Sequence, residues 1–215
     1  MKTTSIILAS LMTVGSSSAA THMTAIIDGD FSEWASVPVQ ADPADNIGSI
    51  DIATIQIAND DDFLYISYTH HTALSNPTFL AIDTDSNVAT GFDVFSLGLV
   101  GVEAQWQNDF PFTSSAGVFN NGSGMSGDFF GSGAAFLNGT ADATQHELAI
   151  SLDITFNGSG AKVFDDDNFT IFLYTDQGAG DTIVPVSYTL ASVPEPSSIG
   201  LLSLGGLALI LRRKK

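Results

Sequence analysis

The chain of 215 residues contains no cysteine, and its central part has almost no basic residues. Without cysteine no disulfide can form, so the central domain has to be held together by packing or by bound metal ions. Lys162 is the only Lys or Arg between Thr21 and Pro194, whereas every acidic residue except Glu195 lies in that segment. A surface of this charge repels phosphate backbones, which argues against nucleic acid as a partner. It suits divalent cations or a saline exterior, with simple solubility as the alternative explanation.

Long hydrophobic runs are also missing, and the two apolar stretches at the ends of the chain are both short. At the N-terminus, Lys2 precedes an apolar run from Ile6 to Met12, which is followed by small residues up to Ala20. A positive start, a short apolar run and a small-residue site are typical of a secretory signal peptide. We therefore expect signal peptidase to remove residues 1–20. A membrane-spanning helix is the alternative, but it would need a longer run.

The C-terminal tail, residues 192–215, has three parts in a fixed order. Pro194, Glu195 and Pro196 come first, and the two prolines exclude a continuous strand or helix. Residues 197–211 are almost entirely apolar and predict a helix of about 22 Å, which is shorter than a hydrocarbon core of about 30 Å. The four basic residues 212–215 can extend the helix by snorkelling, and they orient that end toward the cytoplasm.

This order of motif, short helix and basic end resembles the PEP-CTERM sorting signal of Gram-negative bacteria, which an exosortase recognises. The resemblance implies export, single-pass anchoring in the inner membrane, cleavage near Pro194–Pro196, and delivery to the cell surface or the extracellular matrix. An ordinary tail anchor that follows a proline-containing linker is the alternative.

Between the two ends, short stretches alternate between apolar and polar residues and are separated by turn signals. The clearest case runs from His146 to Ile154, with apolar residues at every second position from Leu148. We therefore expect residues 21–191 to form an all-β domain, a jelly-roll-like β-sandwich of two antiparallel sheets packed face to face. The other predicted strands are 52–57, 63–68, 78–82, 94–106, 168–174 and 183–188.

Four stretches of this segment, taken in order, resemble the family 9 carbohydrate-binding module and its relatives. They are Ile27–Gly29 with Glu33–Trp34, Asn59–Asp60 before Phe63–Ile66, Asp83–Asp85 with Thr90–Phe92, and Glu147–Ile150. The resemblance covers most of Ala25 to Tyr188. It implies a β-sandwich with bound calcium and, in some members, a sugar site between aromatic side chains.

The acidic stretch that begins at Asp83 is the predicted calcium site. Calcium prefers about six to eight oxygen ligands from carboxylates, amides and main-chain carbonyls. Asp83, Asp85 and Asn87 stand at alternate positions, so a turning loop can aim all three inward. The further candidate ligands are Asp93, Glu103 and Asp28. The spacing is not that of an EF-hand, and the alternative is an acidic turn that caps strand ends.

Two tryptophans occur, and their positions suggest different roles. Trp34 belongs to the opening motif, where a core role fits, so Trp106 is the candidate platform for stacking against a sugar, with core packing as its alternative. The acidic runs 59–62 and 165–168 are interpreted as solvated turns. His70 and His71 are adjacent on a predicted strand and point to opposite faces, so a shared metal ion is not expected.

No motif of a nucleophilic hydrolase, a phosphate-binding loop or a zinc enzyme occurs, so we expect no enzyme and nominate no catalytic residue. Three hypotheses follow. The first is an exported, calcium-stabilised β-sandwich that binds extracellular polysaccharide. The second is a structural matrix or biofilm protein without a small ligand. The third is a glycan hydrolase, which would need two carboxylates facing each other across a cleft.

Overall fold

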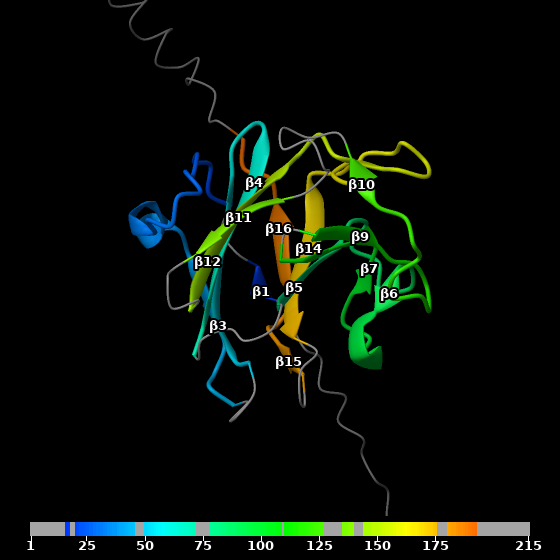
Figure 1. Cartoon of the computed structure of the whole chain (residues 1–215), viewed down its shortest axis with the longest axis horizontal. Coiled ribbons are helices and arrows are strands. Elements are labelled where there is room, and N and C mark those ends of the chain that lie inside the picture. Colours follow the sequence, from blue (N-terminus) through cyan, green and yellow to red (C-terminus); the bar gives the residue numbers. More distant parts are fainter. Residues whose placement is uncertain are drawn as a thin grey trace, which may run out of the picture.

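The computed structural model describes residues 16–17, 20–45, 50–71, 78–108, 110–126, 135–139, 144–175 and 180–192. Two main sheets pack face to face (Figure 1). The predicted all-β sandwich is therefore confirmed. The helical elements in the described ranges are two short 3-10 turns, η1 (Ser32–Ser36) and η2 (Val94–Ser96).

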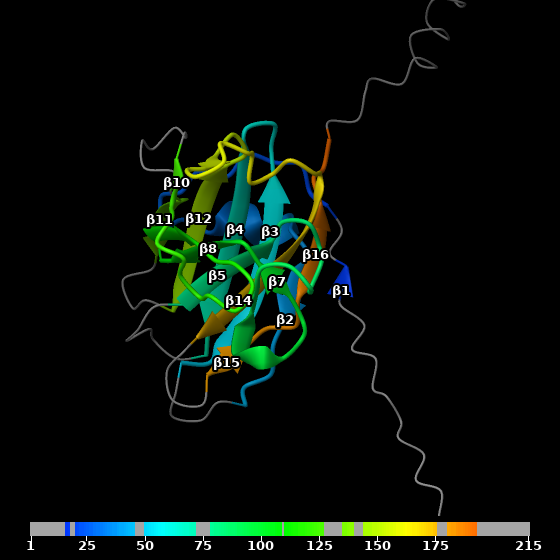
Figure 2. The same cartoon turned by 90° about the vertical axis from the view of Figure 1, so that its right-hand side faces the viewer.

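The first sheet has seven strands, and all its pairings are antiparallel except one. Its strands in spatial order are β1 (Ser16–Ser17), β16 (Val186–Thr189), β14 (Asn168–Thr175), β5 (Thr78–Asp83), β8 (Ala104–Gln107) and β9 (Phe110–Thr113), with β15 (Asp181–Thr182) also paired to β14. The exception is β1, which runs parallel to β16 at the margin of the sandwich (Figure 2).

The second sheet has five strands, all antiparallel. Its strands in spatial order are β11 (Ala135–Gly139), β12 (Gln145–Ser151), β4 (Phe63–His70), β3 (Ile52–Asn59) and β2 (Val39–Ala41). Two short pairs lie outside both sheets: β6 (Phe92–Asp93) with β7 (Gly101–Val102), and β10 (Met125–Ser126) with β13 (Thr155–Phe156).

The main core lies between the two sheets and follows from the alternation of side chains along each strand. On β4, Leu64 and Ile66 face inward, and they meet Ile171 and Leu173 of β14 in one buried cluster. Burying each such side chain stabilises the fold by about 1.5–3 kcal/mol. Packing of apolar side chains can therefore stabilise the fold of a chain that lacks disulfides.

Each sheet is also covered on its outer face, which gives the molecule four layers in Figure 1. The N-terminal segment with η1 covers the five-stranded sheet, where Trp34 packs against Ala58, Tyr65 and Ala149. The segment from β6 through η2 to β7 covers the seven-stranded sheet, where its valines pack against aromatic residues of β5 and β14. Outward-facing side chains near these covers are consequently buried as well.

Among the described residues, no helix has the length and apolar character needed to cross a membrane. The sorting motif at 194–196, the predicted transmembrane helix at 197–211 and the basic end at 212–215 lie outside the described residues. Most of the predicted signal peptide lies outside them too. The boundaries at residues 20 and 191 therefore stay predictions.

Candidate functional site

Three of the predicted calcium ligands come together on the outer face of the seven-stranded sheet. Asp83 ends β5, and Glu103 immediately precedes β8, the antiparallel neighbour of β5, so the two side chains leave the same face. Asp85 follows on the loop after β5. Carboxylate oxygens of Asp83, Asp85 and Glu103 all lie within 4.8 Å of one another.

Backbone N–H groups hold two of these carboxylates in place. Asp83 accepts hydrogen bonds from the N–H groups of Asn87 and Gly101, at 3.0 and 2.9 Å. Glu103 accepts one from the N–H of Thr84 at 2.9 Å through Oε2. Its other oxygen, Oε1, is buried and has no hydrogen-bond partner among the described residues. A buried oxygen of this kind beside two further carboxylates fits a cation-binding site.

The electrostatics of the cluster agree with this geometry. Burial, together with the neighbouring charges of Asp83 and Asp85, raises the pKa of Glu103 to about 7. Burial also raises the pKa of Asp83, although the two backbone hydrogen bonds oppose the shift. Burial and mutual repulsion therefore destabilise the charged forms of these carboxylates, and a bound divalent cation would stabilise them.

Two glycines let the acidic loop lie directly on the β6–β7 pair. A Cβ atom built on Gly101 would lie 2.0 Å from the carbonyl oxygen of Thr90, and one on Gly91 would lie 2.5 Å from Glu103 Oε1. Gly91 also has φ +64°, which favours glycine. The loop that carries Asp85 is thus seated by backbone-to-backbone contact next to Glu103.

Of the other three predicted ligands, Asn87 lies against the cluster through its N–H group, whereas Asp93 and Asp28 lie elsewhere. Asn87 contributes its N–H, while its side-chain oxygen accepts from Ala89. Asp93 instead accepts from the N–H of Gly98. Asp28 is on the opposite side of the molecule, where its N–H donates to Glu147 on the five-stranded sheet. The prediction for Asp28 is wrong, because its contact partner stands 119 residues away and sequence spacing does not reveal it.

Beside the acidic loop, the same cover segment forms a hollow of about 310 Å³. Residues of the β6–η2 segment, Phe119 and Tyr174 line it. Phe95 and Phe119 are about half exposed, and the ring of Phe95 meets that of Tyr174 edge-to-face at 5.6 Å. Four aromatic rings and the carboxylate of Asp93 therefore surround an open apolar space. The full lining is Phe92, Asp93, Val94, Phe95, Ser96, Phe119 and Tyr174.

The exposed Phe95 at this hollow has a strained backbone. Phe95 and Ser96 have φ values of 54° and 58°, in the left-handed region that bulky residues avoid. Such conformations cost about 1–3 kcal/mol each and cluster at functional sites. Sequence reasoning missed this hollow, because the phenylalanines that form it are separated in the chain and resemble ordinary core residues.

Trp106 does not form part of an exposed surface. Its side chain is completely buried between the two sheets, in the same cluster as Leu80 and Ile171. Its ring faces are covered by core residues, so it offers no platform for a sugar, and the prediction of a stacking role is corrected to core packing.

A second acidic group, which the sequence analysis did not single out, lies where the acidic loop after β2 meets β15. Oxygens of Asp42, Asp51 and Asp181 lie within 4.8 Å of one another. Burial and the charge of Asp181 raise the pKa of Asp42 to about 6. Both oxygens of Asp181 accept backbone N–H groups, from Ile52 at 2.6 Å and Thr182 at 2.7 Å. This carboxylate thus joins the start of β3 to β15.

Comparison with known proteins identifies the tail. The PEP-CTERM protein-sorting motif matches residues 192–215. No curated protein matches the chain. Two solved structures of a family 9 carbohydrate-binding module from Caldicellulosiruptor kristjanssonii, in complex with glucose and with cellotriose, are similar in fold. Their identities to this chain are 12% and 11%, they cover 82% and 83% of it and 96% and 97% of their own length, and both have a TM-score of 0.47.

The predicted resemblance of the tail to a sorting signal is therefore confirmed. The sorting motif indicates an exported protein that is anchored in a membrane and then processed, and it implies processing by an exosortase.

Proposed function

We propose that this protein is an exported module that binds an extracellular polysaccharide in the hollow over Phe95 and Tyr174 and is stabilised by calcium at Asp83, Asp85 and Glu103. The observation that carries the proposal is the hollow itself. Its volume of about 310 Å³ is in the usual range of ligand sites. Aromatic rings with one polar group at the edge suit the apolar face and hydroxyl groups of a sugar ring.

The calcium part of the proposal is supported by the three converging carboxylates and the partnerless buried oxygen of Glu103. A bound cation would hold the loop from Asp83 to Gly91, which continues directly into Phe92 of the hollow. The ion would order one wall of the sugar site without touching the sugar.

Binding is favoured over hydrolysis by the lining of the hollow. Glycoside hydrolysis uses two carboxyl groups on either side of the bond that is cleaved. Asp93 is the only carboxylate among the described residues that line the hollow. The alternative is a structural matrix protein without a ligand. That alternative gives no reason for an exposed aromatic side chain in a strained backbone conformation.

A glycan array probed with the full chain in mild detergent, in millimolar calcium and again with a chelator, tests the proposal. We expect retention on at least one polysaccharide, with weaker retention when calcium is removed. A chain that gains thermal stability from calcium but binds no glycan would instead be a structural protein. Release of shortened sugars during the incubation would point to a hydrolase.

A further inference from the structure

The last residue of β3, Asn59, is a buried amide whose hydrogen-bonding groups all have partners. Its side-chain oxygen accepts from the hydroxyl of Tyr188 at 2.9 Å and from the N–H of Ala191 at 2.8 Å. Its side-chain nitrogen donates to the carbonyl of Ala191 at 3.0 Å and to that of Asp60 at 2.8 Å. The side chain therefore binds both main-chain groups of Ala191, as a neighbouring strand would.

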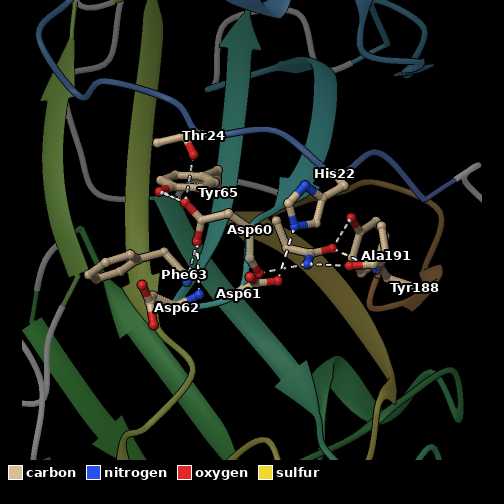
Figure 3. Close-up of polar contacts among 10 residues, drawn as sticks. His22, Thr24, Asp60, Asp61, Asp62, Phe63, Tyr65, Tyr188 and Ala191 are labelled. Atoms are coloured by element: carbon tan, nitrogen blue, oxygen red, sulfur yellow. Dashed lines mark hydrogen bonds and ion pairs between the residues drawn. The ribbon is translucent and has the colours of Figure 1, made fainter. Parts of the chain in front are cut away.

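The backbone of the same residue binds the other end of the domain. The N–H of Asn59 donates to the carbonyl of Thr21 at 3.0 Å, and its carbonyl accepts from the N–H of Met23 at 2.9 Å. Figure 3 shows His22, Tyr188 and Ala191 meeting at this corner, beside the turn that carries Asp61. One residue thus holds both ends of the domain. The turn is exposed to solvent at Asp61 and Asp62, as predicted, and Asn59 at its start is a structural joint.

Further contacts fix the N-terminal side of this joint. Asp60 accepts from the hydroxyls of Thr24 and Tyr65, at 2.9 and 2.7 Å, and from the N–H groups of Asp62 and Phe63. These hydrogen bonds lower the pKa of Asp60 against the opposing effect of burial. On the C-terminal side, β16 pairs with β14 up to Thr189, and the contacts of Asn59 to Tyr188 and Ala191 extend this attachment to residue 191.

The position of Ala191 gives the joint its significance. The sorting motif matches residues 192–215, so the clamped residue directly precedes it. Pro194 stands three positions further on, and three residues of extended chain reach at most about 10 Å. An enzyme that works at Pro194–Pro196 therefore works against the corner of the sandwich at the β3–β4 turn.

We propose that Asn59 is a clamp that sets the boundary between the folded domain and the sorting segment, and that the corner around it is the surface against which the processing peptidase docks. Cleavage breaks one peptide bond beyond Ala191. The acyl carbon passes to water or to an acceptor amine or hydroxyl, and the proton that this acceptor loses goes to the amine of the departing C-terminal fragment. The clamped Ala191 stays in the product. This inference depends on the sorting motif and not on sugar or calcium binding, so the two proposals fail separately.

Amide hydrogen exchange of the full chain in detergent micelles tests the clamp. We expect exchange at Ala191 to be slowed in the native chain and to become roughly tenfold faster in Asn59→Ala. The N–H of Leu190 donates to the carbonyl of Asp167 and should keep its rate, which serves as an internal control. Exchange at Ala191 in the native chain at the rate of an unstructured peptide would overturn the clamp.

Mass spectrometry of the processed protein from a host with the sorting enzyme tests the boundary. Native product should end at or beyond Ala191. The variant Ala191→Pro removes one clamp donor without altering the core, so its products should extend to ends at Thr189 and Leu190 even if Asn59→Ala fails to fold. Phe110→Ala is the control and should process normally, because Phe110 is exposed on β9, at the other edge of the sheet from β16. Native product that ends before Ala191, or identical ends in all variants, would overturn the proposal.

Discussion

The indole of Trp34 donates a hydrogen bond to Glu147 at 3.0 Å, across 113 residues of sequence. The other oxygen of Glu147 accepts the N–H groups of Asp28 and Gly29, at 2.9 and 2.7 Å. A single buried carboxylate on β12 thereby binds three groups of the N-terminal cover to the five-stranded sheet.

We expect Glu147→Gln to lower the free energy of unfolding by about 2–4 kcal/mol, because an amide nitrogen would face groups that can only donate. Chemical unfolding followed by circular dichroism measures the change. Glu33→Gln is the control, since Glu33 is only partly buried and accepts a hydrogen bond from the N–H of Ile26. An equal loss in both variants would contradict the anchoring role of Glu147.

Calcium should raise the melting temperature of the native chain but not that of Glu103→Gln. The substitution removes the oxygen that has no partner, and with it one charge of the proposed site. Asp93→Asn should respond like the native chain, because Asp93 accepts from Gly98 and lies outside the cluster. If Glu103→Gln still responded to calcium and Asp93→Asn did not, the ion would have to bind at Asp93 instead. Differential scanning calorimetry with and without a chelator makes the comparison.

Phe95→Ala should weaken polysaccharide binding by roughly tenfold while leaving the melting temperature nearly unchanged, because the ring is half exposed. Phe110→Ala is the matched control, since Phe110 is more exposed and lies outside the hollow. Affinity electrophoresis in polysaccharide gels measures both. Equal mobility of the two variants would place the sugar elsewhere on the surface.

Gly101→Ala should destabilise the domain by about 1–3 kcal/mol, since the new methyl group would collide with the backbone around Thr90. The added group would also lift the acidic loop, so the calcium response should weaken. A methyl group on Gly158 meets nothing within 4 Å, and Gly158→Ala should be close to neutral. Thermal melts of the three proteins, each with and without calcium, separate the steric effect from the loss of the ion.

His70 gives the domain a sensitivity to acid. Burial, with smaller contributions from His146 and His71, lowers the pKa of His70 from 6.5 to about 4. Between these pH values the unfolded chain binds the proton more readily, so the free energy of unfolding falls as the pH falls from about 6.5 to about 4. His70→Gln should remove up to about 3 kcal/mol of this pH dependence. Urea unfolding at several pH values gives the free energy of unfolding of both proteins as a function of pH. The same pH dependence in both would show that His70 is not the source of the acid sensitivity.

The fold was predictable because alternation is a local property of a strand. Leu148 and Ile150 face the core as expected, and the run that contains them forms β12. The role of Trp106 was not predictable in the same way. Gln105, its neighbour on the other face of β8, is also completely buried, and its amide binds Ser114, Phe119 and Tyr174. Where both faces of a sheet are covered, the polarity of a side chain does not show which face packs against the other sheet.

The acidic site was predictable in part for a related reason. Asp83 and Asp85 are close in sequence, and Glu103 joins them through the pairing of adjacent strands β5 and β8. The position of Asp28 and the hollow around Phe95 depend on which cover lies over which sheet. That arrangement is set by contacts between distant segments, such as that of Trp34 with Glu147.

The scarcity of basic side chains affects how the domain responds to ionic strength. Lys162 pairs with Asp153 at 2.9 Å, and both side chains are largely exposed to solvent. Dissolved ions therefore have little attraction to screen, whereas they shield many carboxylates from one another. A protein held together by surface ion pairs loosens in brine. We expect salt to stabilise this domain, because it is held together by apolar packing and the charges on its surface mostly repel one another.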